Sequence, residues 1–190
     1  MLNQTSLSAF ALVITLLGPS APIFASLAAT AEITTAQTSA PFSYTITLHN
    51  TGDTDIGTFW FAWTNSPADY DFLPSFPTNV QGPSGWFTPV THNPNFSSDG
   101  YGIEWYNYFG SALGPGQSSS AFTFTSTDSP QQLAGNAWFP GFKVTNSFVY
   151  IGFPESDPGF QFVVSVPEPT GAMGGFLLAP LLMRRRDSVR

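Results

Sequence analysis

Few residues of this chain have the types and spacing that catalysis requires. Its two histidines, His49 and His92, stand outside every familiar catalytic motif, and no serine-hydrolase, zinc-protease or phosphate-loop pattern occurs. Glu104 lies in an aromatic segment that could bury a general acid. Glycoside hydrolysis needs a second carboxylate about 5–9.5 Å away, and the sequence does not identify one. We therefore expect no enzymatic activity, with a secreted hydrolase as the least favoured alternative.

Oxygen-bearing side chains gather in one predicted turn. Asn50, Asp53 and Asp55 offer ligands of the kind that calcium prefers, and calcium is available outside the cell. The same residue types also form ordinary turns, because Asn and Asp hydrogen-bond to the local backbone and glycine adopts positive φ. A calcium site and a simple turn are both compatible with this segment. No other cofactor is expected.

The aromatic residues carry the most information about binding. They make up 16% of the chain, and packing in a core explains most of them. A strand over 56–63 would place Trp60 and Trp63 on opposite faces, so that some rings would remain exposed. Exposed planar rings can stack on the apolar C–H faces of sugars. The candidates for glycan stacking are Trp63, Trp86, Tyr106 and Tyr108.

The charge and the lack of cysteine exclude several classes of protein. The net charge is −7, and Lys143 is the single basic residue before Arg184. A domain with this much negative charge repels nucleic acid and anionic lipid headgroups. The absence of cysteine excludes disulfides, thiol catalysis and cysteine-zinc sites.

The pattern of the central region predicts β-structure. Apolar and polar residues alternate over 42–48, and good helix formers such as Lys, Glu and Arg are scarce. We expect one all-β domain over residues 29–165, an immunoglobulin-like or jelly-roll-like antiparallel β-sandwich. The predicted strands cover 42–48, 56–63, 86–91, 101–106, 119–126, 142–153 and 160–166, with a short strand at 78–80.

The first 28 residues have the features of a signal peptide. Leu7–Gly18 is an apolar stretch of suitable length, and small residues follow it. Cleavage after Ala25, Ala28 or Ala31 is compatible with the sequence. The usual positive charge before the apolar stretch is missing. We expect export through the Sec translocon.

Residues 166–190 form a second targeting segment. Pro167, Glu168 and Pro169 precede an apolar run, which ends at Arg184, Arg185 and Arg186. As a helix, Gly171–Met183 would span about 20 Å, which is short of the roughly 30 Å hydrocarbon core. The arginines resist entry into the bilayer and would stay in the cytoplasm. These properties favour a transient transmembrane anchor.

This motif, apolar run and arginine cluster resemble the PEP-CTERM sorting domain of Gram-negative bacteria. The resemblance implies recognition by an exosortase, a transpeptidase-like membrane enzyme, and delivery to the cell surface or an extracellular exopolysaccharide matrix. It also implies that Pro167, Glu168 and Pro169 are the processing motif, and that Arg184, Arg185 and Arg186 retain the tail. The resemblance is confined to the tail and says nothing of the central domain.

The sequence thus predicts an exported surface or matrix protein with a structural or adhesive role. A carbohydrate-binding module of the matrix is the alternative. Exposed Trp or Tyr side chains lining a groove would favour the alternative, and two carboxylates converging in a pocket would favour a hydrolase.

Overall fold

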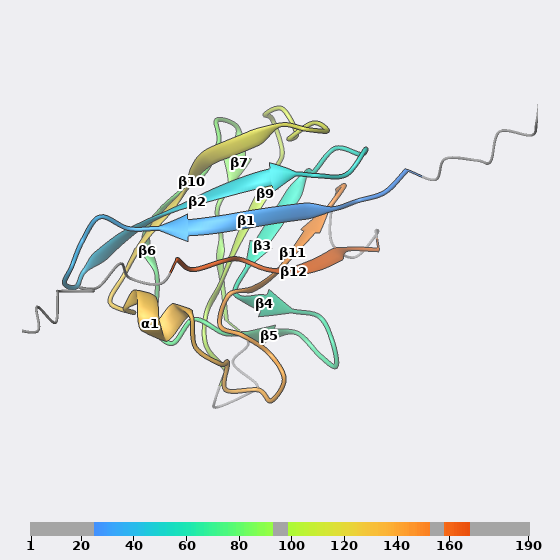
Figure 1. Cartoon of the computed structure of the whole chain (residues 1–190). Coiled ribbons are helices and arrows are strands. Elements are labelled where there is room, and N and C mark those ends of the chain that lie inside the picture. The colour runs from blue at the N-terminus through green and yellow to red at the C-terminus, as the bar shows by residue number, and fades with distance from the viewer. Residues whose placement is uncertain (1–24, 93–98, 153–157, 168–190) are drawn as a thin grey trace, which may run out of the picture.

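The computed structural model describes residues 25–92, 99–152 and 158–167 (Figure 1). Nearly all regular structure in these ranges is antiparallel β-strand, with a single short helix, α1 (Pro130–Leu133). The predicted all-β class is therefore confirmed. The motif residues Glu168 and Pro169, the apolar run and the arginine cluster lie outside the described residues.

The first sheet has four strands in the order β1-β2-β10-β6. Along β2, Phe42, Tyr44, Ile46 and Leu48 are buried, and the polar residues between them face outward. The strand predicted from this alternation is confirmed, whereas β1 is a strand that the sequence did not predict. The bounds are β1 (Ala29–Thr34), β2 (Phe42–Asn50), β6 (Thr78–Gln81) and β10 (Ser118–Ser126).

The second sheet has six strands, five of them in the order β12-β11-β3-β9-β7, with β8 also pairing with β9. Strands β7 and β8 run along the same edge of β9 and replace the single strand predicted over 86–91. Pro89 lies between β7 and β8, and it interrupts the pairing with β9 because proline has no N–H to donate. The Pro89 carbonyl still accepts a hydrogen bond from the Glu104 N–H at 3.0 Å. The bounds are β3 (Thr58–Phe61), β7 (Trp86–Phe87), β8 (Val90–Thr91), β9 (Gly102–Asn107), β11 (Asn146–Tyr150) and β12 (Phe160–Val163).

The core lies between the two sheets, whose strands pass over one another in Figure 1. Phe59 of β3 meets Phe122 of β10 edge-on, with ring centroids 5.3 Å apart, and Phe61 lies 5.6 Å from Phe124. The Trp105 indole N–H donates to the Gln81 carbonyl at 2.8 Å, which joins β9 to β6 across the side of the molecule. Aromatic side chains thus fill the interior, as the composition predicts.

The strand predicted over 56–63 is broken at Ala62. This residue has φ of 59°, in the left-handed region, so the chain leaves the sheet after Phe61. It then forms β4 (Trp63–Thr64), which pairs with β5 (Tyr70–Asp71) in a separate two-stranded sheet. The expectation that Trp60 and Trp63 lie on opposite faces is wrong, because the turn at Ala62 brings Trp63 back over Trp60.

The C-terminal end of the domain is held against β1. The Ser165 N–H donates to the Ala31 carbonyl at 2.9 Å, and the Ile33 N–H donates to the Ser165 carbonyl at 2.9 Å. The folded part therefore reaches Ser165, two residues before Pro167. Within the described ranges, no helix has the length and apolar character needed to cross a bilayer.

Candidate functional site

The most exposed aromatic surface lies at the β7 edge of the six-stranded sheet, on its outer face. It consists of Phe87, Tyr106, Tyr108 and Phe109, and we call it the aromatic patch. Phe87 of β7 is the direct cross-strand partner of Tyr106 in β9, and their rings stack at 5.4 Å with an angle of 12°. Tyr108 and Phe109 follow β9 and meet edge-on at 4.5 Å.

The patch is open to solvent. The exposed fractions are 45% for Phe87, 58% for Tyr108 and 79% for Phe109, while Tyr106 is half-buried. Contiguous apolar rings at a surface mark binding sites more often than single exposed residues do. The structure therefore brings Tyr106 and Tyr108, two of the predicted stacking residues, onto one surface.

Glycine makes the tight turn beside the patch possible. Gly85 has φ of +81°, and its carbonyl accepts the N–H groups of Tyr108 and Phe109 at 3.4 and 3.1 Å. A Cβ atom at Gly85 would lie 2.6 Å from the Cα of Gly110. The turn before β7 thus holds the loop that carries the exposed rings.

The other two predicted stacking residues are buried, which corrects their assignment to a surface. Trp63 is 3% exposed and stacks on Trp60, with ring centroids 3.8 Å apart and an angle of 2°. Phe148 and Tyr150 of β11 close around Trp63 at 5.4 and 6.4 Å. We call Trp60, Trp63, Phe148 and Tyr150 the covered cluster. Trp86 is 8% exposed because it points inward from β7, opposite to Phe87.

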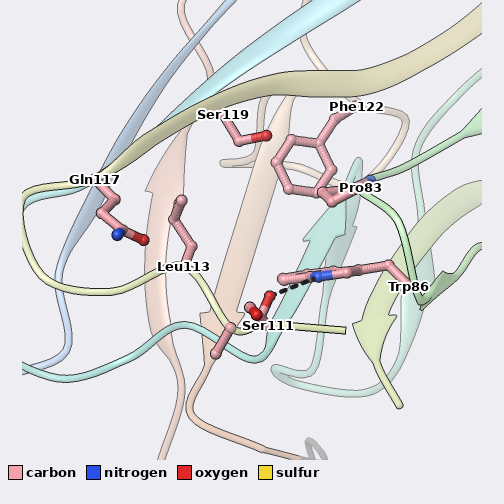
Figure 2. Close-up of a pocket in the computed structure, with 8 residues that line it drawn as sticks. Pro83, Trp86, Ser111, Leu113, Gln117, Ser119 and Phe122 are labelled. Atoms are coloured by element: carbon pink, nitrogen blue, oxygen red, sulfur yellow. Dashed lines mark hydrogen bonds between the residues drawn. The ribbon is translucent and has the colours of Figure 1, made fainter. Parts of the chain in front are cut away.

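Trp86 instead forms one wall of a small pocket (Figure 2). The pocket has a volume of about 210 Å³ and is lined by Pro83, Trp86, Ser111, Ala112, Leu113, Gln117, Ser119 and Phe122. Trp86 and Phe122 meet edge-on at 5.6 Å, and the indole N–H donates to the Ser111 carbonyl at 3.0 Å. A dry cavity of about 150 Å³ is large enough for benzene. This pocket therefore has room for one six-membered ring, with hydroxyl and amide groups beside apolar walls.

Two of the three predicted calcium ligands, Asn50 and Asp53, are engaged in hydrogen bonds with the backbone. The buried Asn50 amide donates to the carbonyls of Thr54 and Leu113 at 2.7 and 2.8 Å, and its oxygen accepts the Gly52 N–H. The Asp53 carboxylate accepts the backbone N–H of Ser26. These contacts account for the turn, and calcium binding by Asn50, Asp53 and Asp55 stays a prediction. In the described ranges, no three His, Cys, Asp or Glu side chains come together in a group that could hold a metal ion.

A buried carboxyl group lies beside the covered cluster. Asp71 is 3% exposed, and the Thr91 hydroxyl donates to it at 2.6 Å while accepting the Trp60 indole N–H at 3.2 Å. Burial, together with the negative charge of Asp99, raises the pKa of Asp71 to about 6. The hydrogen bond from Thr91 opposes this rise in pKa.

Gly102 makes room for the Asp71 carboxyl. A side chain there would collide with the Asp71 carboxyl and the Thr91 hydroxyl, so β9 needs glycine at this position. Glu104, the sequence candidate for a general acid, follows two residues later and is half-buried, whereas its neighbours Ile103 and Trp105 are fully buried. The sequence does not reveal that Asp71 is buried, because its partners come from three separate segments.

Sequence reasoning also missed Phe87 and Phe109 as surface residues. Phe87 follows the inward-facing Trp86, so alternation along a strand predicts that it points outward. Phe109 adjoins Tyr108 in a loop after β9, and no local sequence pattern identified it as exposed. Comparison with protein-family models, with curated proteins and with solved structures gave no significant match.

Proposed function

We propose that this chain is an exported protein of the cell surface or exopolysaccharide matrix, with a structural and adhesive role and no catalytic one. A PEP-CTERM-like tail, recognised by an exosortase-like membrane enzyme, would direct it there after passage through the Sec translocon. One observation carries the proposal: the chain is joined to the domain by the hydrogen bonds of Ser165 and the packing of Val166, immediately before the motif Pro167, Glu168 and Pro169. The two facing antiparallel sheets support an immunoglobulin-like or jelly-roll-like sandwich as the finer fold class.

The place of the aromatic patch supports an adhesive role. Strand β7 is at one edge of the six-stranded sheet and β12, which leads to the tail, is at the other. At about 4.8 Å between neighbouring strands, the four steps from β12 to β7 separate the two edges by roughly 19 Å. A domain held by its tail would therefore present the patch away from the anchored edge.

Fractionation of a Gram-negative host that encodes an exosortase tests the sorting proposal. Replacing Pro167, Glu168 and Pro169 with alanine should leave unprocessed protein in the inner membrane, whereas the wild type is released or reaches the surface. Asp187→Ala, beyond the arginine cluster, is the matched control and should be sorted normally. The same distribution for the triple variant and the wild type would refute sorting by this tail.

Carbohydrate binding is the second candidate, and the aromatic patch favours it. Its stacked and tilted rings suit the apolar faces of successive sugar rings. The net charge of −7 disfavours anionic polysaccharides, so a neutral glycan is the expected ligand. The pocket beside Trp86 has room for a single ring of its own, and the loop from Tyr108 to Leu113 contributes residues to the pocket and to the patch.

Retardation in gels containing neutral polysaccharides tests this candidate. Migration of the wild type should be slowed, and Tyr108→Ala or Phe109→Ala should abolish the effect. Phe76→Ala is a suitable control, because Phe76 is 57% exposed but pairs with Tyr101, outside the patch. Loss of retardation in the control as well, or no retardation of the wild type by any neutral polysaccharide, would count against the patch as a glycan site.

A further inference from the structure

The start of the described chain is tied to the turn between β2 and β3. The N–H groups of Thr51 and Gly52 donate to the Ala28 carbonyl at 3.0 and 3.1 Å, and the Asp53 N–H donates to the Ser26 carbonyl at 3.0 Å. In return, the Ser26 N–H donates to the Asp53 carboxylate. A side chain at Gly52 would collide with the Ser26 carbonyl, so this turn is built to receive the segment from Ser26 to Ala28.

These contacts distinguish the three cleavage positions that the sequence allows. Cleavage after Ala31 would remove half of β1, including the buried residues Ala29 and Ala31, and the carbonyl that accepts the Ser165 N–H. It would also need a leader longer than the usual 15–30 residues. Cleavage after Ala28 would remove the hydrogen bonds of Ser26 and Ala28 with the turn. Cleavage after Ala25 keeps every one of these contacts.

We propose that the leader is removed by hydrolysis of the Ala25–Ser26 peptide bond, and that the new α-ammonium group of Ser26 pairs with Asp53. This inference rests on the proposed export of the protein. Water adds across the bond, so that Ala25 leaves with a carboxyl group and Ser26 gains an amine, which is protonated at neutral pH. After cleavage, the positive charge of the Ser26 ammonium group would lie beside the Asp53 carboxylate, because the Ser26 nitrogen already donates a hydrogen bond to that carboxylate.

The chemistry of both residues fits this assignment. Ala25 supplies the small residue that precedes a leader cleavage site, and Ala25 and Ser26 are both exposed. A hydrogen bond between an ammonium and a carboxylate is stronger than one from a neutral amide. Processing would therefore strengthen the contact that fastens β1 to the turn.

N-terminal sequencing and intact mass of the full chain, exported from a Gram-negative host, test the cleavage site. The mature protein should begin at Ser26. Ala25→Phe should prevent cleavage there, while Ala28→Phe, the same change at the competing position, should still yield Ser26. A mature N-terminus at Ala29 or Glu32 would overturn the inference and leave export intact. Recovery of the wild type with Met1 in place would refute both the inference and the proposed export.

Thermal unfolding tests the ion pair separately. Asp53→Asn should lower the Tm of the processed protein by about 2 °C, as expected for an exposed pair, and should have a smaller effect in the uncleaved Ala25→Phe chain. Asp55→Asn, an exposed carboxylate in the same turn, should leave the Tm unchanged in both. Equal effects of Asp53→Asn in the cleaved and uncleaved chains would overturn the ammonium pair.

Discussion

The outer face of the six-stranded sheet holds two aromatic groups that differ in their exposure to solvent. The covered cluster on β3 and β11 excludes solvent from Trp63, whereas the aromatic patch on β7 and β9 leaves Phe109 79% exposed. In both groups, some of the rings belong to strand residues that point outward from this sheet: Trp60 and Phe148 in the covered cluster, and Phe87 and Tyr106 in the patch. The difference arises at Ala62, where the chain turns back over the sheet and lays Trp63 on Trp60. Nothing in the described residues covers Phe109 and Tyr108 in the same way.

Polar contacts hold this cover in place. The buried Asn146 amide of β11 donates to the Trp63 carbonyl at 2.7 Å and accepts from Gln161 of β12 at 2.7 Å. The Phe72 N–H donates to the Ala62 carbonyl at 2.8 Å. The covered cluster is thus part of the fold, whereas Phe87, Tyr108 and Phe109 of the patch are exposed to solvent. The comparison predicts large effects on stability in the first group and large effects on binding in the second.

Removing the Trp63 side chain, which covers Trp60, should have the largest effect on stability. We expect Trp63→Ala to lower the free energy of unfolding by about 3–5 kcal/mol, because it leaves a cavity over Trp60 and beside Phe148. Urea denaturation followed by circular dichroism measures this change. A loss below about 1 kcal/mol would show that the cluster is not a structural core and would remove the contrast with the patch.

The buried carboxyl group of Asp71, beside the covered cluster, should make the stability of the fold depend on pH. Asp71 has a pKa of about 6 in the folded protein against an ordinary value of 3.8, so the folded state holds this proton more tightly than the unfolded state does. The contribution of Asp71 to stability therefore falls as pH rises from about 4 to above 6, by at most roughly 3 kcal/mol. Asp71→Asn should remove this dependence.

Urea denaturation of wild type and Asp71→Asn at pH 4.5 and 7.5 measures the effect of Asp71. The variant should gain stability relative to the wild type at the higher pH. Thr38→Ala, an exposed change in the loop after β1, serves as a control for the general effect of pH. Parallel pH curves for wild type and Asp71→Asn would contradict the role of this buried carboxyl group.

A β-branched residue at the turn should have an intermediate effect. Ala62→Val places a branched side chain at φ of 59° in a fully buried position, and we expect a loss of about 1–3 kcal/mol. Ala121→Val, at an exposed position of β10, is the matched control and should be close to neutral. Tryptophan fluorescence would report separation of the Trp60 and Trp63 rings. A stable Ala62→Val variant with unchanged fluorescence would show that the turn does not depend on this residue.

The patch should show the smallest effect on stability. We expect Tyr108→Ala to change the free energy of unfolding by no more than about 0.5 kcal/mol, because this side chain is 58% exposed. The same variant should lose the retardation by neutral polysaccharide proposed above. A destabilisation near that of Trp63→Ala would mean that the patch is a structural element, and the comparison would fail.

The sequence predicted the burial of some apolar residues correctly and of others incorrectly. Alternation placed Phe42, Tyr44, Ile46 and Leu48 in the core because a strand with one wet face repeats every two residues. The same rule failed for Trp63, since it assumes an unbroken strand and cannot detect a left-handed residue such as Ala62. Trp86 was placed on the surface because the sequence does not say which face of a short edge strand is covered.

Local patterns by themselves determined the all-β class, the acidic charge and the two terminal segments that predict export. They suffice because composition and alternation depend on neighbouring residues. The tertiary structure decided which aromatic rings are exposed, where the chain leaves the sheet and which group Asp53 contacts. Those outcomes depend on residues far apart in the chain, such as Ser26 with Asp53 and Trp63 with Asn146, which only folding brings together.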